Sequence, residues 1–157
     1  MNSAFFEVYG AGGWEALRDV IRHVPEEIPV ILDAKRGDIA STARAYARAG
    51  FETLGAGAMT VSPYLGSDSW LPFLENPEKA IFLLCKTSNP GADELQTLPV
   101  ATGEPLYLHL ARECISRAAG LAVGLVVGAT DPDALAQVRA ALELLELRLP
   151  WIGGGPS

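Results

Sequence analysis

Two aspartates and a lysine stand close together just after a short run of branched aliphatic residues. The run, 28–32, is typical of a buried strand, and Asp33, Lys35 and Asp38 follow it. Because side chains two residues apart on a strand share a face, Asp33 and Lys35 are predicted to point the same way. An ammonium held beside carboxylates can stabilise developing negative charge and deliver a proton. The segment therefore predicts a site for acid–base chemistry.

Each of these residues also has an ordinary structural interpretation. Asp38 precedes a helix-like stretch, 39–49, whose first turn its side chain could cap. Lys35 taken alone is typical of a solvated loop lysine. Position favours the chemical interpretation, because α/β folds place their active sites at the C-terminal ends of strands.

Strands and helices are predicted to alternate along the whole chain. Apolar runs indicate strands at 28–32, 58–62, 81–85, 121–127 and 147–152. Between them, helical patterns lie at 14–21, 39–49 (closed by Gly50), 68–74, 105–119 and 130–145. The predicted fold is α/β with a parallel sheet, equivalent to about five of the eight βα units of a (β/α)8 barrel.

Composition bounds the class of protein. A chain of 157 residues with 49% hydrophobic composition can bury one core, so we expect a single domain, 1–157. A net charge of −7 argues against a general nucleic-acid surface. The longest apolar stretch, 121–129, is far shorter than the roughly 18 residues that a membrane span needs.

The cysteines and histidines carry little functional signal. Cys85 and Cys114 are too few for a disulfide framework and fit a reducing cytoplasm, which is the expected location. His23 and His109 have no partners at metal-ligand spacing, so both are interpreted as structural and no metal is expected.

Five blocks of the sequence resemble orotidine 5'-phosphate decarboxylases of the longer bacterial type, and they occur in the family's order. The central block is LDAKRGDI, followed by Thr42, and the resemblance extends from Asn2 to about Pro150. The blocks are NSAFFE at 2–7, LDAKRGDI at 32–39, SPYLG at 62–66, KTSNPG at 86–91 and VGAT at 127–130.

The resemblance implies decarboxylation of orotidine 5'-phosphate to uridine 5'-phosphate in de novo pyrimidine biosynthesis, with no cofactor. Lys35 would stabilise and protonate the carbanion left at C6 of the pyrimidine, with Asp33 beside the departing carboxylate. Asp38, with Ile39 and Thr42, would reach into the site of the neighbouring subunit, which implies a homodimer.

The resemblance also assigns substrate contacts outside the charged segment. Asn2 lies in a substrate-binding block, and Ser88 matches a residue that hydrogen-bonds the pyrimidine ring. Gly153 and Gly154 stand where the family holds the substrate phosphate, and their backbone N–H groups are expected to face it.

Compared with the family, the chain is expected to lack the first two strands and the last one. A lysine two places before Asn2, an aspartate of the first strand and a phosphate-binding arginine have no counterpart, and Gly155 replaces a glutamine. A misassigned start at Met1 and a reading-frame change near Trp151 would explain both departures. We therefore expect weak phosphate binding by the isolated chain.

Two other functions stay open at this stage. The first is a Mg²⁺-dependent enzyme like hexulose-phosphate synthase, which shares the Asp-x-Lys-x-x-Asp string and would need further carboxylates at strand ends. The second is a catalytically silent fragment or pseudoenzyme.

Overall fold

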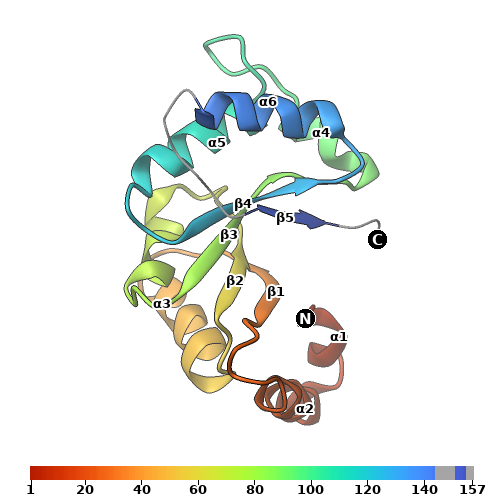
Figure 1. Ribbon diagram of the computed structural model, residues 1–157, viewed down its shortest axis with the longest axis vertical. Helices are drawn as coiled ribbons and strands as arrows, with labels where there is room; N and C mark the ends of the chain where they lie inside the picture. The colour runs from red at the N-terminus through yellow and green to blue at the C-terminus, as the bar shows by residue number, and fades with distance from the viewer. Residues whose placement is uncertain (144–150, 155–157) are drawn as a thin grey trace. The chain divides into compact units, whose positions relative to one another are not determined.

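A computed structural model describes residues 1–143 and 151–154, and strands and helices alternate along it as predicted (Figure 1). The strands are β1 (Ile31–Arg36), β2 (Ala58–Val61), β3 (Ala80–Lys86), β4 (Val123–Gly128) and β5 (Trp151–Gly154). The longer helices are α2 (Gly10–Arg22), α3 (Ala40–Arg48), α5 (Leu106–Arg117) and α6 (Pro132–Glu143). Shorter ones are α1 (Ala4–Glu7), η1 (Ala49–Thr53), η2 (Ser67–Ser69), η3 (Leu71–Leu74), η4 (Pro90–Ala92) and α4 (Asp93–Gln96).

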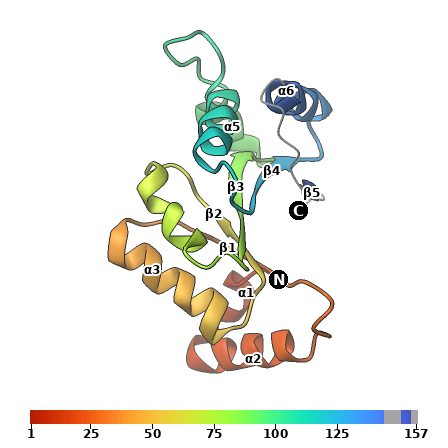
Figure 2. The same cartoon turned by 60° about the vertical axis from the view of Figure 1, so that its left-hand side comes forward.

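The chain forms two compact units, 1–82 and 83–157. In the first unit, β1 pairs with β2 in parallel, with Ile31 opposite Ala58 and Leu32 opposite Met59. Helices α2 and α3 flank this pair (Figure 2). The core of the unit is closed by large side chains that are almost fully buried, among them Leu17, Leu32, Met59, Val61, Trp70 and Phe73.

The second unit follows the same plan. Strand β4 pairs with β5 in parallel, and α5 and α6 lie side by side on one side of that pair (Figures 1 and 2). Its core is made of aliphatic side chains from the strands and from the inner faces of the two helices: Leu83, Ala111, Ile115, Val123, Leu125, Val138 and Leu142. Parallel pairing within both units is what a (β/α)8 barrel requires.

Strand β1 begins three residues later than predicted, and it includes the charged residues. The backbone N–H of Ile28 closes a turn on Pro25 O at 2.9 Å, and Pro29 has no N–H to give to a sheet. The strand then runs from Ile31 through Arg36. Asp33 and Lys35 therefore lie inside the strand rather than after it.

The prediction that Gly50 closes the helix after β1 is wrong. Helix α3 continues without a break into the π-helical turn η1, and the left-handed glycine is Gly55, at φ +83°. Gly50 has a different role: a Cβ at this position would overlap the sulfur of Met59 on β2. The glycine is therefore needed for close approach of the helix to the strand.

Two other boundaries differ from the prediction. The stretch 68–74 forms two short 3₁₀ turns on either side of Trp70, whose side chain is 1% exposed and fills the core. The expected last strand, 147–152, overlaps β5 only at its end, and 147–150 lies outside the described residues. Of the helices that the structure describes, none has the length and apolar character of a membrane span.

The contact between Gly50 and Met59 gives a test of the packing in the first unit. Gly50→Ala should lower the free energy of unfolding by about 1–3 kcal/mol, because the added methyl must displace a buried side chain. Urea denaturation measures this. Gly12→Ala is the matched control, since a Cβ there has no atom within 4 Å, and it should leave stability unchanged or raise it. Equal effects of the two substitutions would refute the packing argument.

Candidate active site

The predicted pairing of Asp33 with Lys35 is present. Lys35 Nζ lies 2.7 Å from Asp33 Oδ1 and 2.8 Å from Oδ2, so the ammonium bridges both carboxylate oxygens. The two side chains are partly open to solvent, at 33% for Asp33 and 49% for Lys35. The ammonium is thus held in a fixed place and is still accessible to a ligand.

The backbone of β1 is irregular where it carries this pair. Lys35 has φ +47°, in the left-handed region that few residues other than glycine adopt. The pairing between β1 and β2 shifts its register between Leu32 and Arg36. The irregularity therefore lies at the residue whose side chain contacts the carboxylate two residues earlier.

Thr60, which sequence reasoning missed, holds both members of the pair. Its hydroxyl donates to Asp33 Oδ1 at 2.7 Å and accepts the backbone N–H of Lys35 at 3.0 Å. Thr60 lies on β2 and is 8% exposed, a buried polar side chain in an otherwise apolar strand. That contrast was visible in the sequence, but only the strand register reveals which residues it faces.

The carboxyl group of Asp33 has a lowered pKa. Burial is the largest single influence and would raise the pKa. It is outweighed by hydrogen bonds from Lys35 and Thr60 and by the positive charges of Lys35 and the terminal amine. Asp33 is therefore an anion at neutral pH, as an acceptor for the lysine must be.

Asn2 lies next to Asp33, and its contact with substrate stays a prediction. The two residues form a parallel bridge, in which Asp33 N donates to Met1 O at 2.7 Å and Ser3 N donates to Asp33 O at 3.1 Å. The side chain of Asn2 accepts the N–H of Ala4 at 3.1 Å, at the start of α1. Residues 1–3 thereby line one edge of β1.

Asp38 does not cap α3, contrary to the structural interpretation of its position. Its Oδ1 accepts the N–H of the adjacent Ile39 at 2.7 Å, and the helix begins at Ala40 with no side-chain cap. Among the described residues, no ion pair joins Asp38 to Lys35. Ile39 is 55% exposed and Thr42 is exposed on the first turn of α3, so this segment presents apolar and polar groups outward.

Arg36 was also missed, although it fixes the end of β1. Its guanidinium pairs with the carboxylate of Glu7 on α1 and lies 5.2 Å from the ring centre of Tyr46 on α3. Arg36, the residue after Lys35, thus connects the end of β1 to both α1 and α3.

In the second unit, Ser88 lies in the loop after β3 and is exposed. Lys86, at the end of the same strand, is 5% exposed and was not predicted as a site residue. Its Nζ lies 2.9 Å from Asp93 Oδ1 and 3.9 Å from Asp131 Oδ2. A lysine directly after the apolar run 81–85 is the signal that sequence reasoning could have used.

The two predicted phosphate glycines lie in a strand. Gly153 is opposite Val127 and Gly154 is opposite Gly128, both within the β4–β5 pair. Gly155 lies outside the described residues, and phosphate binding by the two glycines stays a prediction.

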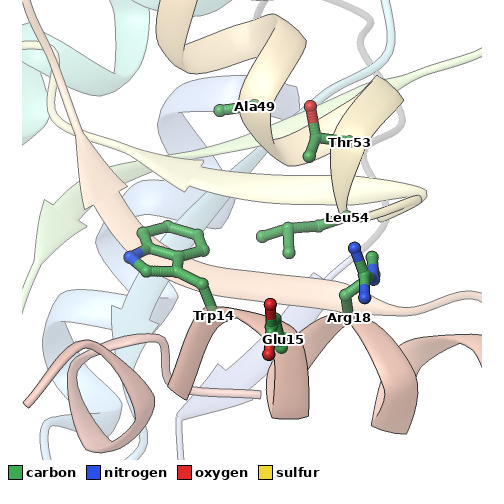
Figure 3. Close-up of a pocket in the computed structure, with 6 residues that line it drawn as sticks. All are labelled: Trp14, Glu15, Arg18, Ala49, Thr53 and Leu54. Carbon is green, nitrogen blue, oxygen red and sulfur yellow. The ribbon is translucent and has the colours of Figure 1, made fainter. Parts of the chain in front are cut away.

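Other candidate features lack the groups that this chemistry needs. A pocket of about 280 Å³ lies between α2 and η1, with Trp14 and Leu54 in its wall, and no strand end contributes to it (Figure 3). His23 Nδ1 contacts Asp19 O at 2.7 Å, and His109 Nδ1 lies 3.3 Å from Glu104. Over the described ranges 1–143 and 151–154, no three His, Cys, Asp or Glu side chains are grouped as a metal site would need.

Comparison with known proteins identifies relatives of this arrangement. The model of the orotidine 5'-phosphate decarboxylase / HUMPS family matches residues 1–149. The orotidine 5'-phosphate decarboxylase of Roseiflexus castenholzii is 53% identical over 155 residues, which is 97% of this chain and 56% of the relative. The same enzyme of Thermomicrobium roseum is 54% identical over 156 residues, which is 97% of this chain and 55% of the relative.

Solved structures give the same result for the fold. The Leishmania donovani OMP decarboxylase superposes with a TM-score of 0.86 at 57% identity, covering 89% of this chain and 56% of that one. With its alternating strands and helices and its parallel pairing, the chain is therefore part of a (β/α)8 barrel, as predicted. It spans about half the length of the curated relatives that it matches.

The environment of Asp33 gives a test of the ion pair. Lys35→Met should raise the pKa of Asp33, because it removes one of the hydrogen bonds and the nearest positive charge that lower it. The carboxyl-carbon chemical shift of Asp33 in an NMR titration measures the change, with Lys79→Met as the control. A pKa that does not move would mean that the pair does not form in solution.

The sign of the associated stability follows from linkage. A carboxyl whose pKa is lowered on folding stabilises the native state above its unfolded pKa, and this stability is lost as the pH falls through the folded value. The parent should therefore lose more stability than Lys35→Met when the pH is lowered below the usual value of 3.8.

Proposed function

We propose that this chain, which belongs to the orotidine 5'-phosphate decarboxylase / HUMPS family, is the part of an enzyme that decarboxylates orotidine 5'-phosphate to uridine 5'-phosphate in pyrimidine biosynthesis. One observation carries the proposal: an accessible ammonium, Lys35 Nζ, is held on both oxygens of Asp33 within β1. The relatives named as decarboxylases support it.

The geometry suits the most difficult step of this reaction. Loss of CO₂ from C6 leaves a carbanion with little resonance stabilisation, so a fixed positive charge that also carries a proton lowers the barrier. Lys35 is the catalytic residue in this proposal: it faces C6, stabilises the negative charge and then donates its proton there. The bond between C6 and the carboxylate breaks, CO₂ departs, and the electron pair left at C6 forms a C–H bond with the proton from Nζ.

Asp33 and Thr60 prepare the lysine for that step. The carboxylate of Asp33 fixes the Nζ position, and in the complex it stands close to the substrate carboxylate, where like charges repel until CO₂ has left. Thr60 is a positioning residue, because its hydroxyl holds Asp33 at 2.7 Å and the Lys35 N–H at 3.0 Å.

The complete site is proposed to be shared by two copies of the chain. Asp38 makes no ion pair among the described residues, and the neighbouring Ile39 is a large apolar side chain that is 55% exposed. Together with Thr42, these residues would enter the partner's site in a homodimer, where Asp38 would complete the charged set around Lys35.

The remaining contacts and the setting follow from the family. We infer from the resemblance that Asn2, which lies beside Asp33, would contact the substrate, that Ser88 would hydrogen-bond the pyrimidine ring, and that the N–H groups of Gly153 and Gly154 would bind phosphate. We infer that 1–157 belongs to one barrel domain, because one family model matches residues 1–149, and that the enzyme acts in the cytoplasm without a cofactor.

The alternatives are less well supported. A synthase that uses Mg²⁺ needs free carboxylates at strand ends. Asp131, which follows β4, is already engaged: Oδ1 accepts the Ala134 N–H at 2.9 Å and Oδ2 lies 3.9 Å from Lys86 Nζ. The second alternative, a catalytically silent fragment, would be supported if the parent chain shows no turnover of orotidine 5'-phosphate.

The role of Lys35 is tested by Lys35→Ala. Turnover should fall by about 10³-fold or more, because the variant loses both the proton donor and the stabilising charge. The loss of orotidylate absorbance measures the rate, and circular dichroism checks the fold. Lys79→Ala, a lysine that donates to Ala56 O at 3.1 Å, should retain the parent rate. Full activity of Lys35→Ala would exclude Lys35 from the mechanism.

The role of metal is tested separately. If the Lys35 ammonium supplies the positive charge, excess EDTA should leave the decarboxylation rate unchanged. Loss of the rate on chelation, with recovery on adding Mg²⁺, would instead favour the synthase-like alternative.

A further inference from the structure

We propose that Lys86 is a positioning residue that holds the Ser88 loop, defined as residues 86–96, in the conformation that presents Ser88 to the base of a pyrimidine nucleotide. The proposal rests on the proposed function, which supplies the nucleotide. No role for Lys86 follows from the catalytic scheme above, and the contacts within the second unit suggest one.

The first observation is the burial of a charged group. Lys86 is 5% exposed, and an ammonium removed from water costs several kcal/mol unless carboxylates and hydrogen bonds compensate it. Here Asp93 at 2.9 Å and Asp131 at 3.9 Å provide that compensation. Asp93 belongs to the Ser88 loop, whereas Asp131 opens α6, so the ammonium joins two separate segments.

The second observation is the way the Ser88 loop is closed. Thr87 N donates to Gln96 Oε1 at 2.8 Å, and Gln96 Nε2 donates to Thr87 Oγ1 at 2.7 Å. Thr87 Oγ1 in turn donates to Asn89 Oδ1 at 2.6 Å. The residues on both sides of Ser88 are thereby fixed, while the Ser88 hydroxyl has no hydrogen bond within the described part of the chain and is free for a ligand.

The third observation is the support under Ser88. A Cβ on Gly128 would lie 3.0 Å from Ser88 Cβ and 3.2 Å from its N, so the loop rests directly on the end of β4. Asp131 N donates to Gly128 O at 3.3 Å, which links that support to the carboxylate beside Lys86. The ammonium therefore ties the Ser88 loop to the surface on which Ser88 lies.

Stabilisation by the two ion pairs does not by itself explain why a lysine occupies position 86. Buried ion pairs are often no more stabilising than apolar side chains of similar volume. The carboxylates stay solvated if the ammonium is removed, since the Asp93 and Asp131 side chains are 73% and 42% exposed. Lys86→Met should therefore fold and leave no buried unpaired charge, which makes its effect on ligand binding interpretable.

The test is a double-mutant cycle read by NMR titration with two probes, uridine 5'-monophosphate and ribose 5-phosphate. Parent, Lys86→Met, Ser88→Ala and the double variant are compared. Lys86→Met should weaken uridine 5'-monophosphate binding by about three- to tenfold, the equivalent of one hydrogen bond, and leave ribose 5-phosphate binding unchanged. In the Ser88→Ala background it should have no further effect, because the two residues act through one contact.

Controls separate this role from general stabilisation. Asp93→Ala removes the nearer carboxylate from a largely exposed position and should reproduce the loss for uridine 5'-monophosphate, so the test stands even if Lys86→Met fails to fold. Glu94→Ala, which removes the adjacent exposed carboxylate, should leave uridine 5'-monophosphate binding unchanged.

The outcomes distinguish this inference from the proposed function. Equal losses for both probes, or a further loss on top of Ser88→Ala, would overturn the positioning role while the nucleotide site remains. A parent chain that does not bind uridine 5'-monophosphate would overturn the proposed function, and this inference with it.

Discussion

The candidate site depends on one strained residue, Lys35. In a regular strand, side chains two residues apart share a face and both residues have an extended backbone, which carries no strain. The left-handed backbone of Lys35 changes this, at a cost of roughly 1–3 kcal/mol for a residue other than glycine. The cost is offset by the Thr60 hydroxyl, which accepts the Lys35 N–H, and by the ammonium on both oxygens of Asp33. Strain and ion pair are thus parts of one arrangement.

Two lysines at strand ends illustrate two uses of the same pairing. Lys35 keeps half of its side chain exposed, so its charge is available to a ligand and its carboxylate partner only fixes its direction. Lys86 is buried and its carboxylate partners face solvent. Its ammonium joins the Ser88 loop to the start of α6 through these two carboxylates. In this chain the lysine proposed to react is the more exposed one, and the lysine proposed to position other groups is the buried one.

Patterns within one segment were predictable, whereas contacts between segments were not. The two-residue period of a strand predicted Asp33 and Lys35 on one face, although not the left-handed backbone at Lys35. Alternating elements indicated an α/β fold with a parallel sheet, to which the family resemblance added the partial barrel. The start of β1 is an exception, because its signal is local: Pro29 has no N–H for a sheet and was outweighed by the aliphatic run around it. Gly50 looked like a helix stop because its true partner, Met59, lies on another strand. Thr60 and Arg36 escaped notice for the same reason: each acts across the register of neighbouring elements.

The groups proposed for chemistry and those proposed for base recognition are built from separate sets of contacts. Asp33, Lys35 and Thr60 hold one another within residues 1–82, and the contacts of Ser88 and Lys86 lie entirely within 83–157. Sites that share no partner contribute additively to stability, so each set can be altered without loosening the other.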